Sequence, residues 1–585
     1  MAPTVFRLAS AAVTAFLLAL PADVLVSAAP LSTRQDTSTY DYIVVGSGAG
    51  GIPLAAQLSA SGARTLLIER GPPSSGRWGG NLRVAPWLQG TNLSSFDVPS
   101  LYNEQWAGTG WEDGIYCDDV EGAIASCVLG GGTAINAGLW WKPASMDWDD
   151  TFPANVGWGS GDLAPATERV FNKIPGTHVP SSDGVISMQQ GPGVLEWAFE
   201  TAGWERELSN ETPEQKTQRR VFTNTTFMYE HGERSGPMAT YLVEASARPN
   251  FELWQNTMVE RVIRDGSKVT GLELKSAGNG GHDGSVGISA NGGSVILSAG
   301  AFGTPKILFR SGIGPQDMLE VVRDAESDKM IAQDQWIDLP VGKNLLDNIN
   351  TDIVIHHPNV VPYDWQAAYN SPIESDKQNY LKNRAGILAQ CASNLNPMVW
   401  EPVTGSDGKY RQLQWTARVA PSLGISNDDG KAMTISNYLG LGQVARGRTT
   451  ITSELKMIVE TMPSPSQNAA DREAIIHGIE SMRSALSNVS DLTILSPKPE
   501  VSASDYVDST EHAAVNHWLG SCKLGTDDGR NGGTAVVDPD TKVYGMDNLF
   551  VVDGSIFPEL TTSNPSAAIV VAAERAAERI LALRK

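Results

Sequence analysis

A glycine-rich turn between an apolar strand and a helix is the feature that most constrains this chain. Residues 41–45 (DYIVV) predict a buried strand that runs directly into GSGAGG. In this run Gly46, Gly48 and Gly51 have the spacing of a dinucleotide-binding turn. The first glycine permits the tight turn, the second lets the backbone approach a pyrophosphate, and the third allows the helix at residues 52–58 to pack closely. A Rossmann-like nucleotide-binding unit is therefore expected at the start of the fold.

The second strand of this unit, residues 65–68, ends at Glu69, which lies 69 − 51 = 18 positions after Gly51. A carboxylate here can accept hydrogen bonds from a ribose diol, and it disfavours NADP, whose 2′-phosphate needs a cation. The motif alone leaves FAD and NAD open.

The N-terminus has the pattern of a secretory signal peptide, residues 1–28. Arg7 precedes an apolar stretch at residues 8–20, and small residues allow cleavage near Ala28. The alternative is a buried N-terminal helix. No other segment reaches 18 apolar residues, so no membrane span is expected. Sequons that fit a secreted glycoprotein start at Asn92, Asn210, Asn224 and Asn488. Free nicotinamide cofactors are scarce outside cells, so a tightly held flavin fits better.

Charge and histidine pattern exclude two classes of partner. The net charge of −22 makes binding to nucleic acid or to an anionic membrane unfavourable. His356 and His357 are adjacent, and neighbours on a strand face opposite ways, so we expect no metal site there.

The four cysteines are too few for a disulfide scaffold. Cys117 and Cys127 could close one short loop in an oxidising compartment. Cys391 and Cys522 could pair with each other or remain buried as thiols.

Three later blocks add to the evidence for a bound cofactor. Residues 129–141 contain three consecutive glycines at 130–132, which would let backbone lie against a flat ring system, although a surface loop is the alternative. Residues 295–305 and 548–554 each predict an apolar strand followed by a glycine turn. The second of these leads to an Ala-rich helix at residues 567–583, whose N-terminus can face an anion or a ring carbonyl.

These four blocks, in this order, resemble the glucose–methanol–choline (GMC) oxidoreductases, a family of FAD enzymes, from about residue 40 to residue 585. Within the family the likeness is closest to the flavodehydrogenase domain of fungal cellobiose dehydrogenases. That likeness is carried by residues 96–99 (FDVP), 127–141, 235–242 (SGPMATYL), 247–251 (ARPNF) and 515–518 (VNHW). Only about a dozen mature residues precede the flavin domain, so the haem-binding cytochrome domain is expected to be absent.

The resemblance implies an α/β fold in which a Rossmann-like FAD-binding domain is interleaved with an α+β substrate domain built on an antiparallel sheet. We assign residues 38–149, 216–349 and 511–585 to the FAD-binding domain. Residues 150–215 and 350–510 are assigned to the substrate domain.

FAD is expected to be noncovalent, because no histidine lies between residues 113 and 142, where some relatives attach the cofactor. The residues expected to bind it are Gly46, Gly48, Gly51, Glu69, Gly131, Gly132, Thr133, Asn136, Val259, Gly300, Asp553, Gly554 and Pro565.

Oxidation of an alcohol by hydride transfer needs a base beside the flavin and a donor that orients the oxygen. The resemblance assigns the base to His517 and the donor to Asn564, with Asn516 beside them. Asn cannot act as a base, so His517 should be the only one. The alternatives are a buried core histidine for His517 and a turn-capping role before Pro565 for Asn564.

The sugar-contacting positions of the relatives fall on Asn103, Trp106 and Arg418, although Arg418 could equally form a surface ion pair. Relatives have an acidic residue and a Phe where this chain has Asn103 and Trp106, so the identity of the substrate stays open. Trp106, Trp140 and Trp518 are expected beside the site.

The sequence therefore predicts a secreted, monomeric FAD-dependent dehydrogenase that oxidises the anomeric carbon of a mono- or oligosaccharide to the lactone. A quinone or a redox protein would accept the electrons. The alternatives are a GMC oxidase of aryl alcohols or glucose that forms hydrogen peroxide, an NAD-linked dehydrogenase, and a non-catalytic flavin- or carbohydrate-binding protein.

Overall fold

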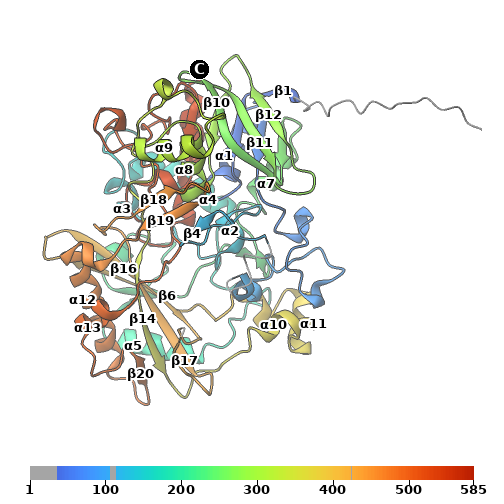
Figure 1. The fold of residues 1–585 in the computed structure, drawn as a ribbon. Helices are drawn as coiled ribbons and strands as arrows, with labels where there is room; N and C mark the ends of the chain where they lie inside the picture. The colour runs from blue at the N-terminus through green and yellow to red at the C-terminus, as the bar shows by residue number, and fades with distance from the viewer. Residues whose placement is uncertain (1–35, 106–113, 423, 585) are drawn as a thin grey trace, which may run out of the picture. The chain divides into compact units, whose positions relative to one another are not determined.

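The computed structural model describes residues 36–105, 114–422 and 424–584. The proposed signal peptide, residues 1–28, and Trp106 lie outside the described residues. The described chain contains two large hydrophobic cores, each organised by its own sheet. Figure 1 shows the elements of the first core in the upper half of the view and those of the second in the lower half.

A five-stranded parallel sheet organises the first core, with the strand order β21-β13-β2-β3-β9. Its strands are β21 (Leu549–Val551), β13 (Ser294–Leu297), β2 (Tyr42–Val45), β3 (Thr65–Ile68) and β9 (Phe251–Trp254). Every residue of the first four is buried, as expected for parallel strands covered on both faces. This sheet confirms the predicted Rossmann-like unit and the strands expected in the later blocks.

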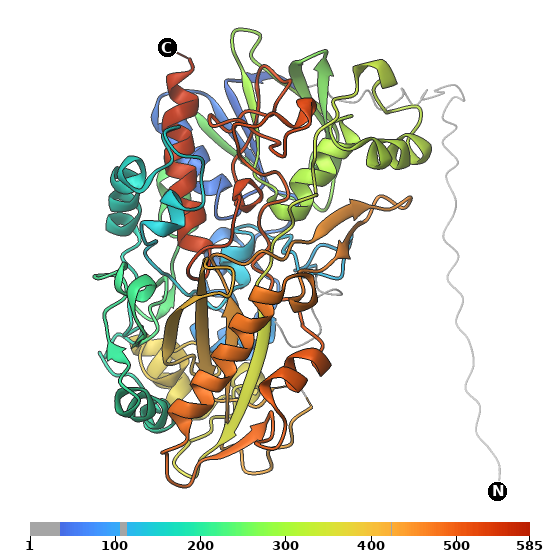
Figure 2. The same ribbon diagram turned by 90° about the vertical axis from the view of Figure 1, so that its left-hand side faces the viewer.

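Helices and a second sheet pack around these strands. Helix α1 (Gly51–Ala60) packs against α7 (Tyr241–Ser246) and α14 (Ser566–Ala582), and α14 also packs against α4 (Ser160–Lys173). Figure 2 shows α14 as the long red helix that leads to the C-terminus. A four-stranded sheet contacts β3 and β13. Its order is β1 (Asp36–Tyr40), β12 (Gly284–Ile288), β11 (Lys268–Ser276) and β10 (Thr257–Asp265).

A seven-stranded sheet organises the second core, and all its pairs are antiparallel except β5 with β6. Its order is β20 (Thr493–Ser496), β14 (Ile349–His356), β17 (Ala432–Leu439), β16 (Tyr410–Arg418), β15 (Met398–Thr404), β6 (Val221–Thr223) and β5 (Glu205–Arg206). Helix α12 (Ala469–Leu486) packs on β15, β16 and β17 and crosses in front of the sheet in Figure 2. Helices α5 (Gln190–Thr201) and α13 (Ala503–Ser509) pack against α12.

The two faces of this sheet differ in chemistry. Ile353, Leu413 and Ile435 are fully buried in the core that includes α12. Since side chains alternate along a strand, their neighbours face the other way. Those neighbours include Asp352 and Ser436, which line a cavity described below.

The chain passes between the two cores at points that differ from the predicted domain boundaries. Within the predicted substrate segment 150–215, α4 lies in the first core, whereas α5 lies in the second. A small sheet, β18 (Arg448–Ile451), β19 (Met457–Thr461) and β4 (Val120–Glu121), likewise contributes Ile451 and Met457 to the first core. The other named elements are α2 (Gly132–Ile135), α3 (Met146–Asp149), α6 (Gln215–Gln218), β7 (Tyr229–Glu230), β8 (Glu233–Arg234), α8 (Gly300–Arg310), α9 (Gln316–Ala325), α10 (Ala367–Asn370) and α11 (Glu374–Asn383).

Cys117 and Cys127 form a disulfide, a pairing that the sequence left open, while Cys391 and Cys522 are buried free thiols. None of the helices in the described part of the chain has both the length and the apolar character to cross a membrane.

Candidate active site

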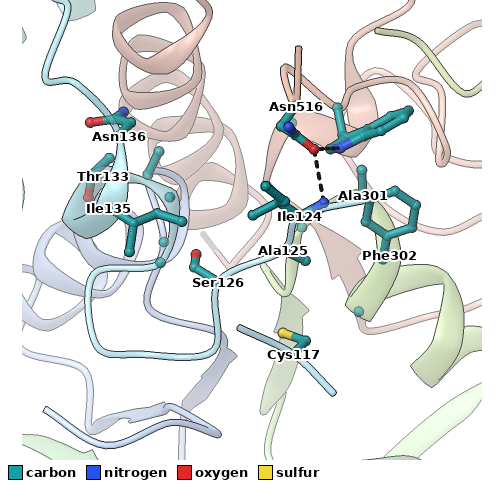
Figure 3. A pocket seen from close by; sticks show the side chains of 18 of the residues that line it. Cys117, Ile124, Ala125, Ser126, Thr133, Ile135, Asn136, Ala301, Phe302 and Asn516 are labelled. Atoms are coloured by element: carbon teal, nitrogen blue, oxygen red, sulfur yellow. Dashed lines mark hydrogen bonds between the residues drawn. The ribbon is translucent and has the colours of Figure 1, made fainter. Parts of the chain in front are cut away.

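A cavity of about 810 Å³ runs between the glycine turns of the first core and the polar face of the seven-stranded sheet. Figure 3 shows part of its wall, where residues 124–126 and the start of α2 face Phe302 of α8 and Asn516. Apart from Gly51 and from Trp106, which lies outside the described residues, the predicted cofactor, catalytic and substrate residues all line this one cavity.

The cofactor end of this cavity is built from backbone that only glycine allows to approach so closely. Gly46 has φ +100°, and a Cβ there would lie 2.4 Å from the carbonyl oxygen of Ser298. A Cβ on Gly51 would lie 1.8 Å from the oxygen of Gly46, so this glycine serves helix packing, as predicted. A Cβ on Gly48 would meet nothing within 4 Å, which leaves this part of the turn open to the cavity.

Glu69 lies at the end of β3 and is buried. Its Oε2 accepts a hydrogen bond from the backbone N–H of Ser47 (3.0 Å), and its Oε1 accepts one from that of Gly71 (2.8 Å). Burial raises the pKa of this carboxyl. Glu69 thus holds the glycine turn in shape in addition to lining the cavity.

Asp553 joins the turn after β21 to the start of α8. Its Oδ2 accepts hydrogen bonds from the N–H of Gly300 (2.8 Å) and the hydroxyl of Thr304 (2.6 Å), and its Oδ1 accepts one from the N–H of Ser555 (2.8 Å). Burial raises the pKa of Asp553. On the opposite wall, Asn136 Nδ2 donates to the hydroxyl of Ser566 at the start of α14 (3.1 Å).

These features fit a flavin dinucleotide. Gly48, Gly132 and Gly300 line the cavity and each have open space where a Cβ would project, so no side chain of their own separates this backbone from a bound ligand. Apart from Gly51, all the predicted cofactor residues line this cavity: Gly46, Gly48, Glu69, Gly131, Gly132, Thr133, Asn136, Val259, Gly300, Asp553, Gly554 and Pro565.

His517 and Asn564 meet at the other end of the cavity. Asn564 Nδ2 lies 3.0 Å from His517 Nε2. Asn564 Oδ1 accepts hydrogen bonds from the indole N–H of Trp141 (3.2 Å) and from Gln414 Nε2 (2.9 Å). Because an indole N–H can only donate, this contact orients the amide with its NH₂ group toward the imidazole.

The second ring nitrogen of His517 contacts Asn348, a residue that sequence reasoning missed. His517 Nδ1 lies 2.8 Å from Asn348 Oδ1, and Asn348 Nδ2 donates to the backbone oxygen of Leu439 (2.8 Å). Burial lowers the pKa of His517 to about 4, so the ring is neutral over the ordinary pH range.

Asn516 does not turn its amide oxygen toward the cavity as a free substrate contact. Its Oδ1 accepts hydrogen bonds from the backbone N–H of Ile124 (2.9 Å) and the indole of Trp518 (3.0 Å), which Figure 3 marks with dashed lines. Asn516 therefore ties the disulfide-closed segment 117–127 to the loop that carries His517.

The predicted substrate residues Asn103 and Arg418 both line the cavity. Asn103 Nδ2 donates to the hydroxyl of Ser393 (2.9 Å). Arg418 Nη1 donates to the hydroxyl of Ser436 (2.7 Å), and its Nη2 lies 3.7 Å from Asp352 Oδ2. The ion pair proposed as an alternative for Arg418 therefore exists, but it lies in the cavity wall and not on the outer surface.

The structure also tests the predictions made for Trp140 and for the pair His356 and His357. The prediction that Trp140 lies beside the site is wrong, because this residue is fully buried and its indole N–H donates to the backbone oxygen of Ile174. Trp141, the next residue, contacts Asn564 instead. His356 and His357 have separate partners, Asp429 and the oxygen of Ser490, as their opposite orientations predict.

The residues that sequence reasoning missed include Asp347, Asn348, Asp352, Gln414 and Trp141. Trp141 ends the glycine-rich block 129–141, but the other four come from separate strands and loops and belong to no compact motif. The only available signal was the alternation of polar and apolar residues in β14 and β16, which marks a sheet with one polar face.

Comparison with known proteins gives consistent results. Models of the GMC oxidoreductase family match residues 40–350 and 444–573. Oxygen-dependent choline dehydrogenase of Rhizobium rhizogenes is 27% identical over 573 residues, which cover 92% of this chain and 95% of that protein.

Two solved structures share the fold. An arginine-to-lysine variant of formate oxidase from Aspergillus oryzae, solved to show the effect of that mutation on FAD modification, is 17% identical with a TM-score of 0.71, covering 93% of this chain and 98% of that one. A fungal aryl-alcohol oxidase is 18% identical with a TM-score of 0.67, covering 93% and 99%. At these identities the likeness shows the fold alone.

Proposed function

This chain belongs to the GMC oxidoreductase family, whose members bind FAD and oxidise alcohol groups, and from that premise we propose that it oxidises the anomeric carbon of a mono- or oligosaccharide to the lactone. The closer kinship with cellobiose dehydrogenases is part of the same proposal. A quinone or a redox protein is the proposed electron acceptor, and the working form is a monomer.

The polar face of the seven-stranded sheet carries this proposal. Asn350 and Asp352 of β14, Thr416 and Arg418 of β16, and Ser436 of β17 all line the cavity. Within the described residues, Oδ1 of Asn350 and Oδ1 of Asp352 accept no hydrogen bond. A buried acceptor without a partner costs about 1–3 kcal/mol, so a rotation of either side chain that brings its oxygen to a ligand hydroxyl would recover that cost.

The charges at this end disfavour other substrates of the family. Arg418 lies next to Asp352, so neither a cation such as choline nor an anion meets an uncompensated opposite charge. An aryl alcohol would leave the polar groups of three strands without partners. A neutral molecule with several hydroxyl groups satisfies both conditions.

The proposed proton transfer uses His517 and Asn564, whose side chains are already in contact. His517 Nε2 accepts the proton of the reacting hydroxyl, and its low pKa keeps it neutral and ready to do so. Asn564 Nδ2 carries two hydrogens, so it can donate one to the substrate oxygen as the hydroxyl approaches Nε2. Bound FAD supplies the acceptor for the hydride that leaves the carbon.

A panel of substrates under anaerobic conditions tests the proposal. Cellobiose, xylobiose and glucose should bleach the visible absorbance of the bound flavin, whereas aryl alcohols and choline should not. Fast reoxidation by a quinone and slow reoxidation by oxygen would support a dehydrogenase. Bleaching by aryl alcohols alone, with hydrogen peroxide formed in air, would establish the alternative oxidase function.

Secretion and glycosylation remain part of the proposal. The Cys117–Cys127 disulfide is consistent with an oxidising compartment. Asn92 and Asn488 are exposed. The side-chain amide of Asn210, by contrast, accepts a hydrogen bond from the backbone N–H of Lys142 and donates one to the backbone oxygen of Trp140. We expect glycans at the two exposed sequons, and peptide mapping after enzymatic deglycosylation would detect them.

A further inference from the structure

We propose that Asn348 is a positioning residue that holds His517 in the tautomer with hydrogen on Nδ1, so that Nε2 alone faces the substrate as a proton acceptor. The inference rests on the proposed role of His517 as the base, but it does not depend on the identity of the alcohol.

The orientation of the Asn348 amide follows from its second contact. Asn348 Nδ2 donates to the backbone oxygen of Leu439 at 2.8 Å, and a carbonyl oxygen can only accept. The amide oxygen of Asn348 must therefore face His517, 2.8 Å from Nδ1. An amide oxygen also only accepts, so Nδ1 carries the hydrogen.

The other side of the ring leads independently to the same tautomer. Trp141 donates to Asn564 Oδ1, which turns Nδ2 of Asn564 toward His517 Nε2. An NH₂ group needs an acceptor, so Nε2 carries a lone pair. Two amides, each oriented by a partner of fixed polarity, thus agree on one form of the neutral imidazole.

The residue before Asn348 positions the backbone of the same loop. Asp347 is 1% exposed, and its carboxylate accepts hydrogen bonds from the N–H groups of Val515 (2.8 Å), Asn516 (3.0 Å) and His517 (2.9 Å). Asn516 lies between them with φ +66°, a left-handed conformation that needs such support. Residues 347 and 348 together place both the ring and its backbone.

A neutral partner at this position also bears on the basicity of the ring. The titratable groups that face His517 are Asp347, at its backbone, and Tyr438, whose ring lies edge-on at 5.9 Å. Asp352 and Arg418 line the same cavity farther along β14 and β16. A carboxylate in place of the Asn348 amide would face Nδ1–H directly and stabilise the charged ring.

Three variants test the inference with whichever alcohol reduces the enzyme. Asn348→Asp keeps an acceptor at Nδ1 and should move the acidic limb of the kcat/KM profile upward by about 1–3 pH units. Above that limb kcat should return close to the wild-type value. Asn348→Leu removes the acceptor and should lower kcat roughly 10–100-fold with little change in KM. Asn383→Asp, an exposed substitution on α11, adds the same charge elsewhere and serves as the control.

Flavin absorbance shows whether each variant retains FAD and hence its fold. Nitrogen-15 NMR of labelled histidine gives a readout that needs no turnover. The His517 resonances, assigned by their loss in His517→Ala, should show protonated Nδ1 and unprotonated Nε2 in the wild type, and this pattern should be lost in Asn348→Leu.

A wild-type spectrum with hydrogen on Nε2 would overturn the inference, as would identical pH profiles for wild type and Asn348→Asp. If no sugar reduces the flavin but another alcohol does, the proposed substrate fails while this inference stands or falls on the same variants.

Discussion

The two ends of the cavity differ in which part of the chain lines them. The cofactor end is mostly backbone, brought close by glycines in short strand–turn–helix segments. The substrate end is mostly side chains, contributed by β14, β16 and β17 and by the loops around His517 and Asn564. Backbone sites depend on local chain geometry, whereas side-chain sites depend on how distant strands align. The first should tolerate almost no added atoms, and the second should respond to single groups in graded steps.

The largest expected effect is at the cofactor end. Gly46→Ala should abolish the FAD-loaded protein, because its Cβ would lie 2.4 Å from the Ser298 oxygen and the residue has φ +100°. Gly48→Ala is the matched comparison, since its Cβ meets no protein atom within 4 Å. It should fold with an unchanged Tm but bind FAD at least about tenfold more weakly, because the methyl group enters the cavity. Flavin absorbance and thermal unfolding measure both properties, and normal FAD binding by Gly48→Ala would show that this turn does not face the cofactor.

The next effect separates chemistry from binding. His517→Ala should lower kcat about 10²–10⁴-fold while FAD stays bound, because a general base contributes that much to proton transfer. Stopped-flow reduction of the flavin is the direct measurement. His231→Ala, which alters a side chain that is 87% exposed, is the control and should react like the wild type. Turnover of His517→Ala at more than a tenth of the wild-type rate would remove His517 from the role of base.

The same contrast explains what the sequence could predict. Glycine spacing, the acidic Glu69 and the strand–turn–helix blocks are local patterns, so the cofactor end was located almost completely. His517 and Asn564 were located through the family resemblance. Asn348 and Asp352 were missed because alternation along β14 indicates only that one face is polar; what their side chains contact depends on the pairing of β14 with β17.

Trp140 and Trp141 show the same limit at the scale of one residue. Both are buried, but only Trp141 contacts Asn564, while Trp140 donates to Ile174 in the first core. Two adjacent residues of the same type thus have different roles, and only the three-dimensional structure distinguishes them.

A smaller effect is expected from a single group on the sheet. Asp352→Asn keeps the size of the side chain but removes the charge that Arg418 and a sugar hydroxyl would share. KM for the sugar substrate should rise roughly 10–100-fold with kcat almost unchanged, the range expected for one hydrogen bond to a charged group. Asp324→Asn, on an exposed part of α9, is the control. An unchanged KM would mean that the sugar does not reach β14.

The smallest expected effect is the response of the wild-type enzyme to pH, and it distinguishes two buried groups beside the same loop. Burial lowers the pKa of His517 to about 4 and raises that of Asp347 to about 6. A base with a lowered pKa stays neutral as the pH falls from 8 to 5, so kcat/KM should change less than about twofold over that range if only His517 controls the rate. Below pH 5 the rate should fall as the ring takes up a proton.

Protonation of Asp347 near pH 6 would act differently, because it weakens the hydrogen bonds to the N–H groups of residues 515–517 without occupying Nε2. A limb near pH 6 would therefore report the backbone clamp, and a limb near pH 4 would report the base. Asp347→Asn separates them: a limb near pH 6 that disappears in this variant belongs to Asp347, whereas one that persists would show that His517 keeps an ordinary pKa despite its burial. In that case water reaches the His517 ring at the substrate end. The two ends of the cavity would then differ in solvent access as well as in how they are built.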